Sequence, residues 1–224
     1  MSTSFFFNFF FFGETSVLIC HLTSGFNITS EAIAAENASV YYPLLNEFTT
    51  LYEGPAPSDK QLHDFAVSYA LDNDYIQPDQ VAFIDLALAI HTHSALIHSY
   101  YQFHDTLAEP AAQHLEPDCS TWVAYNGKTS CNSDLVFALE TAGKSARMPL
   151  LLPIDKVLRA PLTNDDSLPY AVLYTDLVDF EGFAKFHTHL YGSALAGKLN
   201  YVVRYRAPTT TAESNSARQQ LTGY

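Results

Sequence analysis

The sequence predicts an α/β domain with a large helical insertion, and three observations support this prediction. An apolar run at 170–174 is followed by an amphipathic helical pattern and then by a second apolar run at 199–206. Upstream, residues from about 31 to 107 carry helical spacing instead of alternation. The chain has 224 residues, 48% of them apolar, which is enough to bury a sizeable core.

Helices are expected throughout a lobe that covers residues about 40–110. Ser58 and Gln61 have the spacing of a capping box, in which two side chains satisfy backbone amides at a helix start. The next helix is expected over about 81–90. It is apolar nearly all round, so we expect it to be buried in the middle of the lobe. A further helix is expected over about 94–107 and is closed by a proline.

Two cysteines flank a predicted hairpin. Cys119 and Cys131 lie on either side of a strand-like run and of Asn126-Gly127, the strongest short hairpin signal. A two-residue turn would place Cys131 opposite Trp122, so a disulfide requires a wider loop or a chain that curls back at Cys119. If the bond forms, closing so short a loop stabilises the fold by about 3 kcal/mol in the chain-entropy model. Two separate buried thiols are the alternative interpretation.

The C-terminal part predicts a strand, a helix of about four turns and a second strand over 169–206. Such a unit has parallel strands and a right-handed connection. Gly197 is placed to end its helix. Before this unit, a helix is expected from residue 132 or 133 to 142. After it, residues 208–217 lack periodicity, which predicts a loop.

The charge balance disfavours two classes of partner. Eleven basic and 24 acidic residues give a net charge of −13, and the basic residues are scattered. A polyanion or an anionic lipid surface would be repelled by this charge. We therefore expect no nucleic-acid partner and no membrane partner.

Residues 1–30 are an atypical, phenylalanine-rich N-terminus. The run at 5–12 has the length of a signal-peptide core but no basic segment before it, and it is too short to span a bilayer. A degenerate signal, a buried strand continuing through 16–20 and a mispredicted first exon are the alternatives. An exposed aromatic run would aggregate, so it must be buried or removed.

The residues suited to chemistry do not form a catalytic or metal-binding pattern. Three cysteines without a C-x-x-C cannot build a zinc ribbon or a redox dithiol, and Cys20 has no obvious partner. In the two H-x-H pairs, His91 with His93 and His187 with His189, the side chains would point to different faces of a helix. We expect these histidines mostly at the surface or near helix C-termini. No metal site and no catalytic residue is therefore predicted.

Two N-glycosylation sequons are present, at Asn27 and at Asn37. Each tripeptide also recurs by chance, so together they add only a little support for a secretory route.

Several separate blocks resemble, in the right order, the N-terminal thioredoxin-like domain of UDP-glucose:glycoprotein glucosyltransferase. They are Leu-Ala-Leu-Ala-Ile-His-Thr-His-Ser-Ala at 86–95, the cysteine hairpin 119–131 followed by Asn-Ser-Asp, the strand and helix at 170–189, Ala-Gly-Lys-Leu-Asn-Tyr-Val-Val-Arg at 196–204, and Leu-Thr-Gly-Tyr at 221–224. The resemblance covers about residues 31–224.

The resemblance implies a location and a role. The parent enzymes are large proteins of the endoplasmic reticulum lumen that reglucosylate misfolded glycoproteins, with UDP-glucose and calcium at a C-terminal catalytic domain. That domain is missing here, so no cofactor ligand is carried over to any residue and no activity is expected of this chain alone. The expected role is scaffolding and client recognition. The expected partners are misfolded glycoproteins and the other domains of the parent enzyme.

The resemblance also defines where redox chemistry would have to occur. Redox-active thioredoxins place a C-x-x-C after a strand, at the start of the next helix, because the helix N-terminus lowers the pKa of the thiol. Here the junction 174–180 reads Tyr-Thr-Asp-Leu-Val-Asp-Phe and contains no sulfur. We therefore expect a redox-inactive thioredoxin-like domain.

Two alternatives to the scaffold remain open. One is a thiol-disulfide oxidoreductase relative that uses Cys119 and Cys131. The other is a truncated gene product without independent function.

Overall fold

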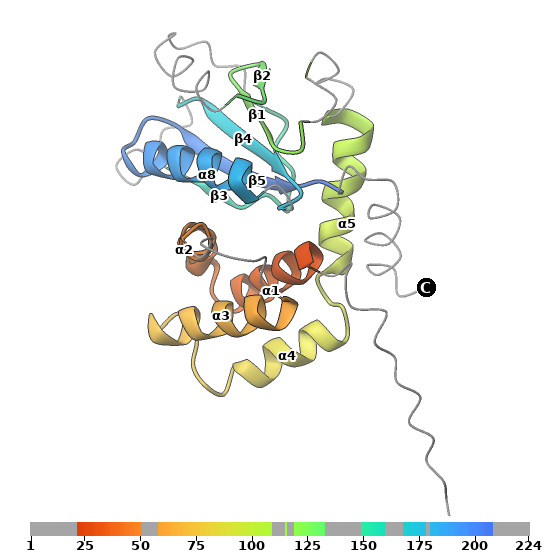
Figure 1. Cartoon of the computed structure of the whole chain (residues 1–224), viewed down its shortest axis with the longest axis vertical. Helices are drawn as coiled ribbons and strands as arrows, with labels where there is room; N and C mark the ends of the chain where they lie inside the picture. The colour runs from red at the N-terminus through yellow and green to blue at the C-terminus, as the bar shows by residue number, and fades with distance from the viewer. Residues whose placement is uncertain are drawn as a thin grey trace, which may run out of the picture.

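The structure, a computed structural model, describes residues 22–50, 58–108, 115, 119–132, 149–159, 168–177 and 180–207. In Figure 1 these residues form a helical lobe on one side of a five-stranded sheet. The predictions for the phenylalanine run, Cys20, the helix at 132–142 and the loop after residue 208 lie outside the described residues.

The lobe is built from the helices that precede the described strands. They are α1 (Leu22–Glu36), the 3-10 turn η1 (Ala38–Val40), α2 (Tyr41–Phe48), α3 (Asp59–Asp72), α4 (Val81–Ala89), α5 (Ser94–Phe103) and the π-helical turn η2 (His104–Ala108). Helix α1 runs through the boundary expected at residue 30. Helix α5 begins at the lobe and extends along the side of the sheet (Figure 1).

The predicted capping box at the start of α3 is confirmed. The Ser58 backbone amide donates to Gln61 Oε1 over 2.8 Å, and the Gln61 amide donates to Ser58 Oγ over 3.3 Å. These reciprocal bonds satisfy donors that have no partner within the helix, so they fix where α3 begins.

The sheet contains β1 (Trp122–Tyr125), β2 (Lys128–Ser130), β3 (Val157–Leu158), β4 (Tyr170–Thr175) and β5 (Asn200–Tyr205), in the order β2-β1-β4-β5-β3. The predicted unit is present: β4 and β5 are parallel and joined by α8 (Phe180–Leu195). Strand β1 is antiparallel to both β2 and β4, and β3 is antiparallel to β5. Gly197, with φ of 75°, ends α8 as expected.

Each face of the sheet belongs to its own apolar cluster. One face, with Leu173, Tyr201 and Val203, packs with α8 and with the lobe. The opposite face packs around Trp122 and Tyr174, whose rings stack with centroids 4.1 Å apart, and meets the end of the π-helical turn. The chain thus has the expected α/β architecture, with helices that bury a mixed sheet.

The prediction for the apolar helix at 81–90 is wrong in its burial. Phe83, Leu86 and Ile90 are 63%, 56% and 65% exposed, and Ile84 is the buried residue of α4. Helix α4 packs against α1 and lies at the far end of the lobe (Figure 1). Val81 and Leu88 are partly buried against the core, so α4 is covered from one side and exposes apolar side chains on the other.

Candidate functional site

The corner between β4 and α8 is buried and holds no sulfur. Thr175, Asp176 and Leu177 are 0%, 3% and 5% exposed. The hydroxyl of Thr175 accepts a hydrogen bond from the Leu177 amide over 3.0 Å and lies 3.2 Å from the hydroxyl of Thr121. A hydroxyl nucleophile needs an adjacent base, and these partners are an amide and a second hydroxyl. The corner therefore contributes packing and hydrogen bonds.

Cys119 and Cys131 form a disulfide in the structure, with their Cα atoms 5.9 Å apart. The hairpin has the expected two-residue turn, because Tyr125 pairs with Lys128. Of the two geometries left open by the sequence, the chain adopts the one that curls back at Cys119. The guanidinium of Arg206 supports this curl by donating to the Cys119 carbonyl over 2.7 Å.

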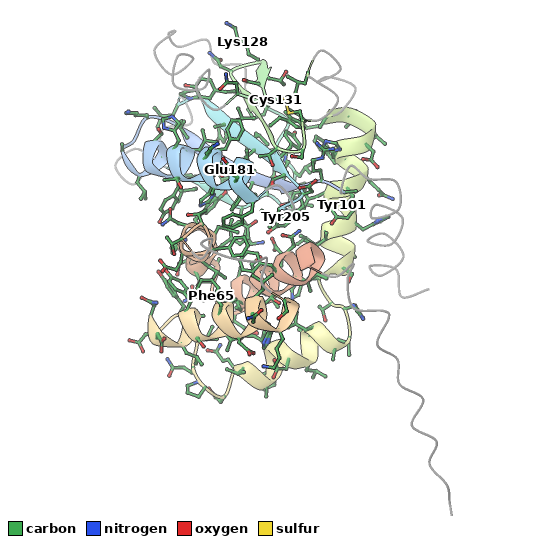
Figure 2. The ribbon with its side chains drawn as sticks, in the orientation of Figure 1. Phe65, Tyr101, Lys128, Cys131, Glu181 and Tyr205 are labelled. Carbon is green, nitrogen blue, oxygen red and sulfur yellow. A yellow bond between two sulfur atoms is a disulfide. The ribbon has the colours of Figure 1, made fainter. Side chains whose placement is uncertain are left out.

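The two sulfur atoms do not lie at the catalytic position of a thioredoxin. Both cysteines are half-buried and pack with Trp122 and its neighbours on one face of the sheet. Leu177 and the first residues of α8 belong to the cluster on the other face. Figure 2 shows Cys131 at the hairpin end of the sheet. The disulfide thus closes the β1–β2 hairpin and does not meet the helix N-terminus that would activate a thiol.

A buried ion pair joins β5 to the segment before β3. Arg204 donates through Nε and Nη2 to the carboxylate of Asp155, and through Nη1 to the hydroxyl of Tyr174 over 2.9 Å. Its guanidinium also lies 4.7 Å from the centroid of the Phe103 ring. With its donors engaged in this way, Arg204 is bound within the fold and is not available to a ligand.

A second polar network lies between the lobe and the sheet. Lys156 pairs with the buried carboxylate of Glu31, and the hydroxyls of Tyr41 and Tyr205 are 2.7 Å apart. The Tyr205 hydroxyl also donates to Glu31 Oε1 over 3.4 Å. Burial raises the pKa of both tyrosines well above 10, so both stay protonated. They act as hydrogen-bond partners and not as acids or bases.

His187 departs from the expectation of a surface histidine. It is fully buried on α8, between the rings of Phe183 and Tyr191, and its Nδ1 lies 2.9 Å from the hydroxyl of Tyr201. Burial lowers the pKa of His187 to about 3, so its ring is neutral near pH 7. Its spacing on α8 matches that of Phe183 and Leu190, which lie on the helix face that packs on the sheet.

The two sequons lie in different environments. Asn27 is completely buried within α1, so a glycan on it does not fit this structure. Asn37 is half-buried and caps η1: its Oδ1 accepts from the Ser39 amide over 3.1 Å, and its Nδ2 donates to the Tyr75 carbonyl over 3.0 Å. A sugar on Nδ2 of Asn37 would have to be accommodated beside Tyr75.

The described ranges contain neither a metal-binding cluster nor a single membrane-spanning helix. No group of three or more histidine, cysteine, aspartate or glutamate residues there is arranged to hold a metal ion. No single described helix is long and apolar enough to cross a membrane. Helix α4 and the helix from Ser94 to Ala108 reach that length and composition only together, with a bend of 58° between them.

The sequence reasoning missed the ion pairs of Arg204 and Glu31 and the burial of His187. One signal was available for the first. An arginine in the middle of the apolar run Tyr-Val-Val-Arg-Tyr needs a buried acidic partner. Its partner, Asp155, is 49 residues away, and spacing alone does not single it out.

Comparison with known proteins gives consistent matches. The family model of a thioredoxin-like domain matches residues 23–214. Human UDP-glucose:glycoprotein glucosyltransferase 1 is 27% identical over 180 residues, which are 79% of this chain and 11% of that protein. The mouse protein of the same name is 28% identical over 131 residues, 58% of this chain and 8% of its own. The chain spans about a tenth of the length of these relatives.

Proposed function

This chain belongs to the thioredoxin-like domain family, and from that premise we propose that it is a non-catalytic client-recognition and scaffold domain of the UDP-glucose:glycoprotein glucosyltransferase type. In this role it holds misfolded glycoproteins by their exposed apolar surface in the lumen of the endoplasmic reticulum. Glucosyl transfer, with UDP-glucose and calcium, would belong to another domain of such an enzyme.

The observation that carries this proposal is the buried, sulfur-free corner between β4 and α8. The position at which a redox-active thioredoxin performs its chemistry is occupied here by Thr175, Asp176 and Leu177. The family relationship therefore comes without a nucleophile at the expected site. The described part of the chain can therefore recognise a partner through its shape, its apolar surface and its charge.

Two further observations support the proposed location and role. The disulfide between Cys119 and Cys131 is a kind of cross-link that persists in oxidising compartments such as the endoplasmic reticulum. Helix α4 exposes large apolar side chains, which is the surface that a protein binding unfolded chains requires.

A binding experiment tests the proposal. The purified chain is immobilised, and one glycoprotein is passed over it in native form, in reduced and alkylated denatured form, and in denatured form after removal of its glycans. We expect both denatured forms to bind and the native form not to bind, because apolar segments are recognised. Equal binding of the native and denatured forms would contradict client recognition.

An activity assay separates this function from the oxidoreductase alternative. With dithiothreitol as the reductant, the chain is expected to give no acceleration of insulin reduction above the background rate. Turnover that is lost in the Cys119→Ala variant would instead assign thiol-disulfide exchange to the hairpin.

A further inference from the structure

We propose that the outer face of α4 binds an apolar polypeptide segment that carries basic residues beside its apolar core. This inference rests on the proposed function, because it locates the client-binding surface and specifies the charge of the segment that the surface selects. The surface is defined by Phe83, Leu86 and Ile90 and is called the α4 face below.

The α4 face is continuous. Leu86 follows Phe83 by three positions, and Ile90, the C-cap residue of α4, follows Leu86 by four, which places all three on one side of the helix. Six large apolar side chains are exposed in the described part of the chain, and three of them are on the α4 face. Exposed apolar residues that gather in this way mark interaction sites, whereas single ones are ordinary.

The α4 face is also held in place from behind. Ile84 is buried on the inner side of the helix. Asp85 Oδ1 lies 3.1 Å from Nε2 of His63 on α3, and Gln80 donates to Glu36 at the end of α1 over 2.9 Å. Because α4 is anchored to both α1 and α3, its exposed apolar side chains are held in place before a partner arrives. Binding therefore costs less conformational entropy.

The charge around this face selects the partner. Between residues 22 and 108 the sequence has eleven acidic residues and a single lysine, Lys60, whose ammonium group pairs with Asp64. Asp79, just before α4, and Asp85, on α4, are both exposed, and the Asp85 carboxylate lies toward His63. Such a field attracts lysine and arginine and repels acidic segments and anionic lipid.

The same charge argues against a second copy of this chain as the occupant. Two molecules that each carry a net charge of −13 would have to bring their most acidic lobes together. An unfolded polypeptide with an apolar core and basic flanks meets both requirements of the surface. It supplies cover for the three side chains and charge of the opposite sign.

The test uses the whole chain and three fluorescent peptides with one apolar core, flanked by lysine, serine or glutamate. In fluorescence anisotropy, we expect the lysine-flanked peptide to bind at least about ten-fold more tightly than the glutamate-flanked one. Raising the salt concentration should reduce that difference. The double variant Phe83→Gln, Leu86→Gln should weaken binding by about ten-fold or more, because it removes two apolar contacts.

Leu195→Gln is the matched control, since Leu195 is also an exposed leucine on a helix, at 46% exposure, but lies at the end of α8. It should leave peptide binding unchanged. All variants replace exposed side chains, and circular dichroism verifies that they fold.

Several results would overturn the proposal. These are equal binding of the double variant and the parent chain, equal binding of acidic and basic peptides, α4-dependent binding to phosphatidylserine vesicles, and a dimer in sedimentation that the double variant abolishes. If the double variant still binds denatured glycoprotein in preference to the native form, the α4 face is not the client-binding surface, whereas the proposed function stands. If the parent chain binds no denatured protein, the proposed function itself fails.

Discussion

Asp155 and Arg204 meet through two buried hydrogen bonds, Nε to Oδ1 over 2.9 Å and Nη2 to Oδ2 over 2.6 Å. Their side chains are 1% and 2% exposed. The second carboxylate oxygen also accepts from the Leu152 amide over 2.7 Å. The pair therefore fixes the turn before β3 against β5, the strand to which β3 is bonded.

Removing one partner of this pair should destabilise the fold strongly. Asp155→Ala leaves the Arg204 charge buried and uncompensated, so the free energy of unfolding should fall by about 3–5 kcal/mol. Urea denaturation measures the change. Lys60→Ala, which breaks a solvent-screened exposed pair, should change the free energy of unfolding far less. If Asp155→Ala does not fold, the double variant Asp155→Leu, Arg204→Met should recover most of the stability, because no charge is then left buried. A cost for Asp155→Ala no larger than that for Lys60→Ala would contradict this account.

The stability of the chain should depend on His187 as the pH falls. The pKa of His187 is about 3 in the folded state, against about 6.5 in an unfolded chain. The unfolded state therefore takes up the proton first, so this stabilisation is complete above pH 6.5 and is lost progressively down to pH 3. The contribution amounts to about 2 kcal/mol between pH 7 and pH 5. His187→Phe should show a correspondingly smaller loss of stability in urea titrations over that interval. If the free energy of unfolding of His187→Phe depends on pH as steeply as that of the parent chain, this role of His187 is contradicted.

Two glycines close together should respond to alanine in opposite directions. Gly192 lies inside α8, and a Cβ added there meets nothing within 4 Å, so Gly192→Ala should raise the free energy of unfolding by about 0.5–1 kcal/mol. Gly197 has equal space but a φ of +75°, so Gly197→Ala should lower it by about 1 kcal/mol. Thermal unfolding of the two variants side by side measures both changes. If both variants change the free energy of unfolding in the same direction, the backbone conformation at residue 197 does not decide the effect of alanine there.

Reduction of the disulfide should lower the free energy of unfolding without unfolding the chain in water. The bond between Cys119 and Cys131 closes a short loop, and its loss should cost about 3 kcal/mol in the chain-entropy model. Urea midpoints with and without dithiothreitol measure this cost. The variant Cys119→Ala, Cys131→Ala is the control and should not respond to the reductant.

Local signals in the sequence predicted much of the fold. The capping box at Ser58, the Asn126-Gly127 turn and the glycine at 197 are each decided by the backbone requirements of a few neighbouring residues. The strands β4 and β5 are apolar because both faces of the sheet are covered, and that pattern is visible in the chain itself.

The errors share a different physical origin. The apolar pattern of α4 is that of a buried helix, but burial depends on how many neighbours pack around it, which is set by the tertiary arrangement. His187 was expected at the surface because of its residue type, although its position on α8 follows the apolar face of that helix. Residue type and residue position disagreed there, and position decided the outcome.

The tyrosine pair at the junction has a consequence for how this domain can be dissected. Tyr205 of β5 is fully buried and forms hydrogen bonds with Tyr41 and Glu31. Figure 2 shows it between the sheet and the lobe. Cutting away the helices to obtain a minimal sheet would uncover an aromatic surface and strip a phenol of its partners. Removing α1 and α2 would therefore take packing and hydrogen bonds away from the sheet as well as from the lobe.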